Sequence, residues 1–282
     1  MLKITSRDNS KIKTAGRVRD GSDKDLIFVE GLRLAEEFSR SRLKIFDVFY
    51  TEDLARTERG AEFLRTAETS NLTEVSAKVF DSLADTKTSQ GIILIGEKPA
   101  ANRQIIEAKL RETPDFPLLV LLHQINNPSN LGAILRTCEA VGAAGVITTK
   151  NSAHAFSPKA LRGAMGASLR IPMWTDADFF EVLDWAKNNN FTSACAAVNV
   201  AKSYLEIDWR VPRLLVFGSE AHGLSAEEFK KVDESLLIPM ANNVESLNLA
   251  VAAGVILFEA KRQSESVVEN SKLDEAKNIY YK

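Results

Sequence analysis

Cysteine and histidine are scarce in this chain, and their scarcity limits the chemistry that it can carry out. The 282 residues include two cysteines and three histidines, and they do not form a metal-ligand cluster. Cys138 and Cys195 lie in apolar segments, so we expect two small, buried thiols of a reduced protein rather than a disulfide. We also expect no metal ion in the site.

Long apolar runs are missing as well. No segment approaches the roughly 18 apolar residues that a membrane-spanning helix needs, so we expect no membrane partner. Residues 1–8 lack the apolar core of a signal peptide. Together with the reduced cysteines, these absences predict a cytoplasmic protein.

The chain also lacks the motifs of three common enzyme sites. A dinucleotide fingerprint needs three glycines at fixed spacing, whereas residues 126–137 hold only Gly132. Neither the Gly-Lys-Ser/Thr of a phosphate-binding loop nor the Gly-x-Ser-x-Gly of a serine hydrolase occurs. The remaining candidates are Asn, Arg, Glu, Ser and backbone groups, which suit the binding of a polar cofactor and the orientation of a hydroxyl.

Charge is balanced over the whole chain but not at its start. In total, 36 Lys and Arg face 38 Asp and Glu, for a net charge of −2. Residues 1–20 instead hold six cations and two anions, a local excess of four positive charges. A basic segment on a near-neutral protein indicates a polyanionic partner. A solvated terminal helix is the alternative.

The apolar pattern predicts two α/β domains. Residues 1–97 alternate helices and strands, beginning with a basic helix over 7–19, and residues 98–116 form a linker that contains a helix. Residues 117–262 indicate a doubly wound parallel sheet, because their strands are continuous apolar runs. Residues 263–282 are polar and are expected to form a loose tail. The predicted strands are 26–29, 45–50, 72–75, 91–95, 118–122, 145–148, 192–197, 214–217 and 236–239. A charged helix is predicted over 54–68.

Three blocks of polar residues accompany strands of the second domain. They span residues 126–137, 216–225 and 238–249. The carboxyl ends of parallel strands meet at one edge of a sheet, where α/β proteins bind their ligands. The sequence therefore predicts that the three blocks form one site.

The three blocks resemble those of the SPOUT methyltransferases, specifically the TrmH/SpoU family of RNA ribose 2′-O-methyltransferases. The first block follows the family pattern Asn-Pro-x-Asn-x-Gly-Ala-x-x-Arg-Thr, and the resemblance covers about residues 117–260. The matching residues are Asn127, Pro128, Asn130, Gly132, Ala133, Arg136, Thr137, Gly218, Glu220, Ile238, Pro239, Met240, Ser246, Leu247 and Asn248.

The resemblance implies an α/β fold in which the parallel sheet of a C-terminal SPOUT domain carries a deep trefoil knot. It also implies S-adenosylmethionine as the cofactor, and a homodimer that completes the active site. The expected cofactor contacts are Phe217, Gly218, Ile238, Met240, Leu247 and Asn248.

Five residues are expected to carry catalysis if the resemblance holds: Arg136, Asn130, Glu220, Ser246 and Asn248. The family assigns to Arg136 the activation of the ribose hydroxyl. Because a free guanidinium stays protonated at neutral pH, we expect it to activate and orient rather than to remove the proton. Asn130 and Glu220 would orient Arg136 or the ribose, and Ser246 and Asn248 would hold the substrate. The structural alternatives are helix capping by the two asparagines and a plain ion pair between Glu220 and Arg136.

Residues 1–97 are similar to the ribosomal-protein-L30e-type domain that often precedes this catalytic domain, through Val29–Leu34 and Ser89–Ile92. The similarity implies a unit that grips structured RNA, largely through its phosphates. The basic residues expected to contact RNA are Arg7, Lys11, Lys13, Arg17, Arg33, Lys159 and Arg162.

The favoured function is methyl transfer from S-adenosylmethionine to a ribose 2′-hydroxyl of structured RNA. Ribosomal RNA is the preferred substrate, because tRNA is often served by family members without the L30e-like domain. The alternatives are a tRNA 2′-O-methyltransferase, a base methyltransferase, and a non-catalytic relative that binds RNA or assists ribosome assembly. Retention of the polar residues in the three blocks argues against the non-catalytic alternative.

Three positions depart from the family pattern, because Ser129, Ala221 and Asn242 stand where glycine is usual. Asparagine adopts a positive φ more readily than most residues, so Asn242 is expected to keep the turn, whereas alanine does so less readily. His222 is the only histidine within a block, and it is a secondary candidate for a base or an RNA contact.

Overall fold

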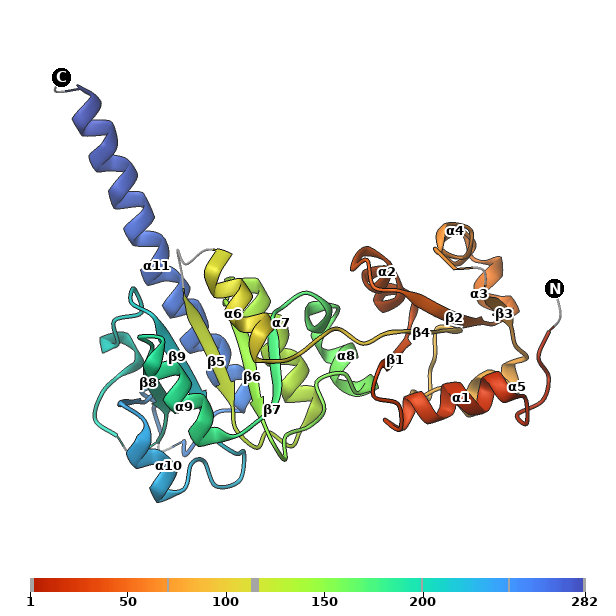
Figure 1. Ribbon diagram of the computed structural model, residues 1–282, viewed down its shortest axis with the longest axis horizontal. Helices are drawn as coiled ribbons and strands as arrows, with labels where there is room; N and C mark the ends of the chain where they lie inside the picture. Colours follow the sequence, from red (N-terminus) through yellow and green to blue (C-terminus); the bar gives the residue numbers. More distant parts are fainter. Residues whose placement is uncertain (1–2, 70, 113–116, 199, 243, 281–282) are drawn as a thin grey trace. The chain divides into compact units, whose positions relative to one another are not determined.

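The computed structural model describes residues 3–69, 71–112, 117–198, 200–242 and 244–280, with side chains as far as residue 265. The chain divides into two compact units, labelled by their elements in Figure 1. Unit 1 comprises Met1–Ala100 and His154–Arg170, and unit 2 comprises Ala101–Ala153 and Ile171–Lys282. The segment 154–170 groups with unit 1, although its place in the sequence assigned it to the second domain. The reason is that helix α8 (Pro158–Ala164) packs against strand β1 (Leu26–Glu30).

Unit 1 is built on a four-stranded mixed sheet in the order β1-β4-β2-β3. Strand β4 pairs antiparallel with both β1 and β2, and β3 runs parallel to β2. The other strands are β2 (Ile45–Tyr50), β3 (Leu72–Glu74) and β4 (Ile92–Glu97). All four lie where the sequence predicts strands.

The helices of unit 1 are α1 (Ser10–Arg19), α2 (Leu32–Arg40), α3 (Glu52–Arg56), α4 (Glu58–Thr66), α5 (Ala77–Leu83), α8 and the short 3-10 helix η1 (Ala167–Leu169). Four of them, α1, α2, α5 and α8, pack against this sheet. The predicted basic helix is confirmed as α1, which begins at Ser10 because the side chain of Asn9 caps it. Its buried residues Ile12, Ala15 and Val18 recur every third position and join the core of the unit.

The single helix predicted over 54–68 is instead two helices, α3 and α4. Thr57 separates them, because its backbone is extended and its hydroxyl accepts the N–H of Gly60 at 3.0 Å to start α4. A Cβ at Gly60 would lie 2.2 Å from the carbonyl oxygen of Leu54. Only glycine therefore allows α4 to begin so close to the end of α3.

Unit 2 contains a six-stranded sheet in the order β10-β8-β9-β5-β6-β7, and every neighbouring pair is parallel. The strands are β5 (Leu118–Leu122), β6 (Gly145–Thr149), β7 (Met173–Ala177), β8 (Thr192–Ala196), β9 (Arg213–Phe217) and β10 (Glu234–Leu236). The predicted doubly wound parallel sheet is confirmed. From β5 the chain adds β6 and β7 on one side, and it then crosses to the other side of β5 to form β8, β9 and β10. The direction of winding therefore reverses between β5 and β9. Such a reversal is the place where doubly wound sheets bind ligands.

Strand β7 has no counterpart in the sequence-based prediction. It lies at one edge of the sheet, and its pairing with β6 shifts register between Ile147 and Thr149. Asp176 within it has a φ of 57°. This irregular, partly polar strand lacks an apolar run of the kind that predicts β5 and β9. The strand predicted over 236–239 is displaced, because β10 spans Glu234–Leu236 and shares only Leu236 with it.

The helices of unit 2 are α6 (Arg103–Glu112), α7 (Pro128–Val141), α9 (Phe179–Asn188), η2 (Tyr204–Glu206), α10 (Ala226–Lys231) and α11 (Leu249–Tyr280). Helix α7 has strong end signals, since Asn127 caps it, Pro128 opens it and Gly142 ends it in the left-handed region. Its start therefore falls inside the first polar block.

The loose tail expected over 263–282 is wrong for the part of it that the structure describes, because α11 continues through Tyr280. Helix α11 packs against α7 and buries Ala253, Ile256, Leu257 and Ala260, whose spacing is that of one helical face. No glycine or proline follows Gly254 within the helix. Once packing has fixed the first turns, nothing in the sequence stops the helix from propagating.

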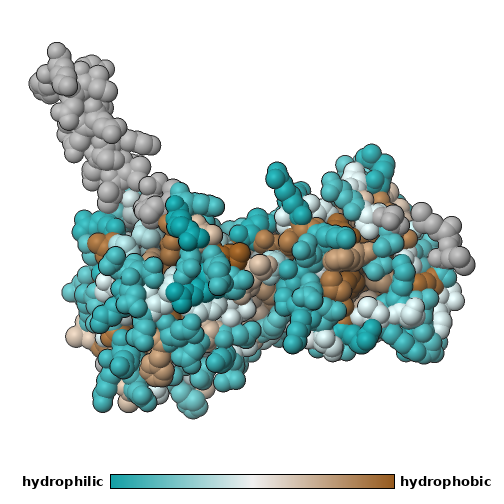
Figure 2. All heavy atoms as spheres, in the orientation of Figure 1, coloured by the Kyte–Doolittle hydropathy of each residue, from teal (hydrophilic) through white to brown (hydrophobic). Residues whose placement is uncertain are grey.

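Both cysteines are free and buried, as predicted. Within the described residues, no helix is long and apolar enough to cross a membrane, and no group of three or more His, Cys, Asp or Glu could hold a metal ion. On the face shown in Figure 2, hydrophilic side chains cover most of the surface and hydrophobic ones form small, separate groups.

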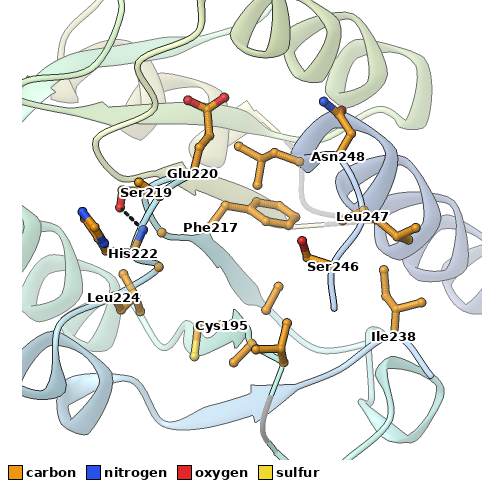
Figure 3. Close-up of a pocket in the computed structure, with 18 of the residues that line it drawn as sticks. Cys195, Phe217, Ser219, Glu220, His222, Leu224, Ile238, Ser246, Leu247 and Asn248 are labelled. Carbon is orange, nitrogen blue, oxygen red and sulfur yellow. Dashed lines mark hydrogen bonds between the residues drawn. The ribbon is translucent and has the colours of Figure 1, made fainter. Parts of the chain in front are cut away.

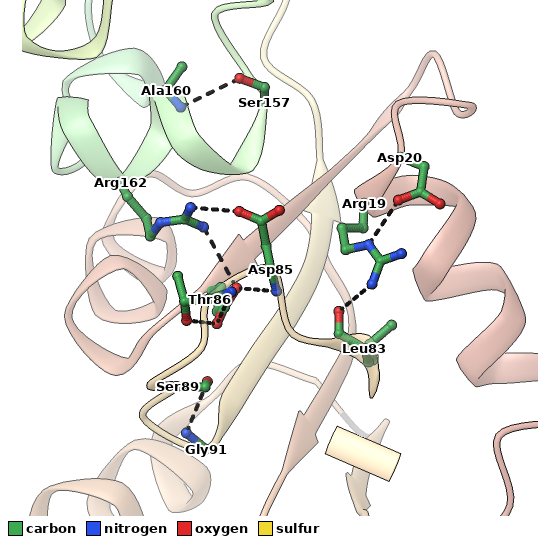
Figure 4. Close-up of polar contacts among 11 residues, drawn as sticks. Arg19, Asp20, Leu83, Asp85, Thr86, Ser89, Gly91, Ser157, Ala160 and Arg162 are labelled. Atoms are coloured by element: carbon green, nitrogen blue, oxygen red, sulfur yellow. Dashed lines mark hydrogen bonds and ion pairs between the residues drawn. The ribbon is translucent and has the colours of Figure 1, made fainter. Parts of the chain in front are cut away.

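Arg162 on α8 is held by carboxylates of unit 1 (Figure 4). Its Nη2 donates to Asp85 at 2.6 Å, and its Nη1 lies 3.6 Å from the buried carboxylate of Glu30. Glu30 also accepts the backbone N–H groups of Asp85 at 2.8 Å and Thr86 at 3.3 Å. An RNA contact by Arg162, as expected from the sequence, would therefore compete with these intramolecular pairs.

We predict that Arg162→Ala destabilises unit 1, because it leaves the buried Glu30 without its cation. The expected loss in free energy of unfolding is about 2 kcal/mol, the cost of a buried group that loses a hydrogen-bonding partner, measured by chemical denaturation of the full chain. Arg162→Lys should lose less, because it keeps the charge. Lys159→Ala is the control, since Lys159 is exposed on the same helix. An Arg162→Ala protein as stable as the control would contradict a structural role for Arg162.

Candidate functional site

A cavity of about 1010 Å³ lies at the carboxyl ends of β8 and β9 in unit 2. All three polar blocks reach it, the first through Asn127 and Asn130, the second through residues 217–224 and the third through Ile238, Met240 and residues 245–249. The structure thus brings together segments that are more than a hundred residues apart in the sequence. Each of the six residues expected to contact a cofactor lines this cavity.

The cavity has an apolar floor and a polar rim. Figure 3 shows Cys195, Phe217, Ile238 and Leu247 around it, with Glu220 and Asn248 at its edge. Phe217 is buried at the end of β9, and Leu236 is buried at the end of β10. The site can therefore accept a ligand that has one apolar, flat part and one polar part.

Large apolar side chains are left exposed around the same cavity. Val198 is 58% exposed, and Met240 and Leu247 are each 37% exposed, although all three line it. Exposed apolar groups that gather around a concave site are typical of a surface that a ligand covers.

Cys195 is the one cysteine of the cavity wall. Burial raises the pKa of its thiol to about 11. The thiol is therefore protonated at neutral pH, which makes it a packing group rather than a nucleophile.

The second block forms a tight turn at the cavity. Ser219 and Gly223 exchange two backbone hydrogen bonds of 3.0 and 2.9 Å, and the Ser219 hydroxyl accepts the N–H of His222 at 3.2 Å. Gly223 carries the positive φ of the turn, at 64°, whereas Ala221 is not among the residues with positive φ. A Cβ at Gly218 would lie 2.4 Å from the carbonyl carbon of Gly223. The turn thus needs Gly218 and Gly223, and it tolerates Ala221.

In the third block, Asn242 has a φ of 58°. The prediction that asparagine keeps the glycine-type turn at this position is confirmed. Its short polar side chain tolerates the left-handed region, which most other residues avoid.

Glu220 links the first block to the second. One carboxylate oxygen accepts the backbone N–H groups of Asn126 and Asn127, at 3.2 and 3.1 Å. The other accepts the side-chain amide of Asn130 at 2.6 Å. Because α7 begins at Pro128, the carboxylate lies at the positive end of this helix.

Asn130 passes the link on to the third block. Its carbonyl oxygen accepts the side-chain amide of Asn248 at 3.2 Å. Asn248 in turn accepts the backbone N–H of Ala250 at 2.9 Å and so caps α11. The capping alternative therefore applies to Asn248 but not to Asn130, because Asn127 caps α7.

Arg136 is not brought into the cavity of its own chain. It is exposed on α7, does not line the cavity, and has no hydrogen bond or ion pair with another described residue. Six residues at 3.6 per turn place its side chain about 120° around the helix from Asn130. The alternative of a plain ion pair between Arg136 and Glu220 is therefore wrong for the residues described.

The remaining candidates divide between the units. Ser246 and His222 are exposed at the cavity of unit 2. The residues expected to bind RNA all lie in unit 1, where Lys11 pairs with Asp47 at 2.9 Å and Lys13 pairs with Asp8 at 2.8 Å. Exposed without a carboxylate partner among the described residues are Arg7, Arg17 and Lys159, whereas Arg33 is exposed but interacts electrostatically with Glu36.

Sequence reasoning missed one wall of the cavity. Ala197, Val198 and Val200, which follow β8, and Phe229 on α10 all line it. This segment lies outside the three polar blocks and matches no motif. The end of a predicted strand was the only available signal, and it becomes informative only once β8 is known to lie beside β9.

Comparison with known proteins gives a consistent result. Residues 117–258 match the SpoU rRNA Methylase family, and residues 9–94 match the MRM3-like substrate binding domain. A tRNA (guanosine(18)-2′-O)-methyltransferase of Thermus thermophilus is 38% identical over 58% of this chain and 83% of its own. A 23S rRNA (guanosine-2′-O-)-methyltransferase of Haemophilus influenzae is 33% identical over 67% of this chain and 77% of its own. An uncharacterized tRNA/rRNA methyltransferase of Synechocystis is 32% identical over 67% of this chain, and the match spans 66% of that relative, slightly under two thirds.

A solved structure shares the fold over most of the chain. The AdoMet-bound rRNA methyltransferase from Sinorhizobium meliloti has a TM-score of 0.76 and 26% identity, covering 93% of this chain and 97% of its own.

We predict that Glu220→Ala loosens the junction of the three blocks, because two backbone N–H groups and one amide lose their acceptor. Hydrogen–deuterium exchange of peptides covering residues 123–131 should quicken about fivefold, the effect of one lost hydrogen bond. Glu245→Ala is the matched control, since Glu245 is exposed at the same cavity. Equal exchange in both variants would show that Glu220 does not hold the junction.

Proposed function

Since this chain belongs to the SpoU rRNA methylase family, we propose that it is an S-adenosylmethionine-dependent methyltransferase acting on a ribose 2′-hydroxyl of structured RNA, with ribosomal RNA as the favoured substrate. The observation that carries the proposal is the meeting of three polar blocks at one cavity with an apolar floor. The relatives named for 23S rRNA and the match to a substrate binding domain support the choice of ribosomal RNA.

The cavity residues suit this cofactor. The ring of Phe217 and the side chains of Ile238 and Leu247 offer an apolar surface for a flat base, and Met240 and Val198 are exposed beside it. When bound, S-adenosylmethionine supplies an electrophilic methyl group on a sulfonium sulfur. Asn248 and Ser246 would hold polar groups at the rim.

The chain's own residues would position the ribose hydroxyl. Glu220 and Asn130 stand at the rim of the cavity, and their hydrogen bonds fix both side chains in place. A hydroxyl is a poor nucleophile, so its orientation and the removal of its proton are the steps that these residues would assist. His222 is exposed beside them and stays a secondary candidate.

Arg136 would act in the cavity of a second copy. The guanidinium is exposed, lies outside its own cavity and has no described partner, which fits a site completed across a homodimer. Phe258 and Val251, 54% and 53% exposed and seven residues apart on one face of α11, offer an apolar surface for that dimer. The deep trefoil knot and a cytoplasmic location stay predictions.

The proposed function is tested by incubating the full chain with radiolabelled S-adenosylmethionine and unmodified 16S rRNA, 23S rRNA and tRNA. We expect label in ribosomal RNA at a position that resists alkaline hydrolysis, because a methylated 2′-oxygen cannot attack the neighbouring phosphate. Label in tRNA alone would favour the tRNA alternative. Alkali-sensitive label would indicate base methylation, and no cofactor binding by calorimetry would favour a non-catalytic protein.

We predict that Arg136→Ala lowers methyl transfer on the order of 10²–10⁴-fold, the range of a group that assists proton transfer, while cofactor affinity stays unchanged. Single-turnover transfer and calorimetry measure the two effects separately. Lys187→Ala, which removes an exposed cation from α9, is the control. Full activity in Arg136→Ala would overturn the assignment of Arg136.

A shared site makes a separate prediction for mixed dimers. Arg136→Ala and Glu220→Ala are each expected to be inactive, but their co-expression should restore transfer, because one dimer interface then joins an intact cavity to an intact arginine. If the mixture stays as inactive as its components, each chain uses its own Arg136.

A further inference from the structure

His123 is a buried residue that the proposed chemistry does not use. It directly follows β5, is 5% exposed, and does not line the cavity. Polar side chains this deeply buried are costly unless their hydrogen bonds are made. The partners of His123 therefore indicate its function.

The backbone N–H and the Nε2 of His123 reach the two ends of one loop. Its backbone N–H donates to the carbonyl oxygen of Phe217, the last residue of β9, at 2.8 Å. Its side-chain Nε2 lies 3.0 Å from the carboxylate of Glu228 on α10. Between these two points runs the segment 218–225, named the pocket loop here, and its residues 218–224 all line the cavity.

Glu228 divides its carboxylate between His123 and the end of the pocket loop. One oxygen faces His123, and the other accepts the backbone N–H of Ser225 at 2.7 Å. The N–H of Glu228 in turn donates to the hydroxyl of Ser225 at 3.3 Å, which completes a capping box. The contact with His123 therefore fixes the start of α10, and with it the end of the pocket loop, to the centre of the sheet.

The environment of the ring keeps it neutral and oriented. Burial lowers the pKa of His123, although Glu228 beside it acts in the opposite direction. Burial also pushes the pKa of Glu228 upward, but hydrogen bonds from Ser225 and His123 outweigh it and leave that pKa below its usual value. At neutral pH the pair is thus a neutral imidazole that donates from Nε2 to a carboxylate.

The opposite edge of the ring is fixed as well. Nδ1 lies 3.1 Å from the hydroxyl of Thr149 at the end of β6, and the ring packs against Phe179 with centroids 4.6 Å apart. A neutral ring with its hydrogen on Nε2 accepts the Thr149 hydroxyl hydrogen at Nδ1. Both ring nitrogens then have partners, so the ring has one preferred orientation.

We infer that His123 is a positioning residue for the cofactor site, because its side chain holds the end of the pocket loop through Glu228, while its backbone N–H holds the start. Glu220 in the middle of the loop is held by Asn126 and Asn127, which follow His123 in the chain. The loop is thus tied at its start, middle and end to the segment that follows β5. The inference rests on the proposed function for its ligand but not for its geometry.

The test compares His123→Ala with His123→Gln in the full chain. The amide nitrogen of glutamine can reach the place of Nε2 and donate to Glu228, whereas alanine removes the donor. We expect alanine to raise both the Kd of S-adenosylmethionine and its KM about tenfold, the effect of one lost hydrogen bond to a charged group, with kcat less affected. Glutamine should restore both constants to within about threefold of the wild type, since it keeps that hydrogen bond.

Ser193→Ala is the matched control for a purely structural effect. It removes a buried hydroxyl 2.6 Å from Asp233 in the same unit, away from the pocket loop. It should lower the melting temperature and leave the cofactor Kd unchanged. An unchanged Kd in His123→Ala, or equal losses in the alanine and glutamine variants, would overturn the inference.

Hydrogen–deuterium exchange separates this inference from the proposed function. Peptides covering residues 218–225 should exchange faster in His123→Ala than in the wild type or in His123→Gln, with no ligand present. If the wild type binds no cofactor, the proposed function fails, and the exchange result still decides whether His123 holds the loop. Equal exchange in all three proteins would overturn the inference.

Discussion

The carboxylate of Glu220 is the contact on which the geometry of the site depends. It accepts two backbone N–H groups at the start of α7 and the side chain of Asn130, which in turn reaches Asn248 at the start of α11. One carboxylate on the loop after β9 thereby holds the start of α7 directly and the start of α11 through Asn130. The helix N-terminus favours a negative group at this place, so the position of Glu220 is electrostatically suited as well as hydrogen-bonded.

The strand order explains why these segments meet at all. Strand β9 lies between β8 and β5, at the point where the sheet reverses its winding. The first block follows β5 and the second follows β9, so pairing these two strands aligns their carboxyl ends. Phe217 closes the floor from β9, and the polar side chains stay at the rim, where water or a ligand satisfies them.

Local signals made much of this protein predictable, and their absence explains the errors. The residue pattern identified the four strands of unit 1 and β5, β6, β8 and β9 of unit 2, whereas the strand predicted over 236–239 shares only Leu236 with β10. Strand β7 was missed because Asp176 and a register shift interrupt it. Thr57 splits a predicted helix through a cap that composition does not reveal. The tail was wrong because the early turns of α11 gain their stability from packing against α7.

The sequence by itself determined the residue types of the site, the parallel sheet and the family, since motif spacing and apolar periodicity are local properties of the chain. Tertiary structure alone decided which of these residues touch. It placed Glu220 within hydrogen-bonding distance of Asn130 and left Arg136 outside the cavity of its own chain. It also placed Arg162 beside the carboxylates of Glu30 and Asp85. It also placed His123 between the two ends of the pocket loop. Such pairings depend on strand order and helix rotation, which bring together residues whose separation in the sequence carries no information about their contact.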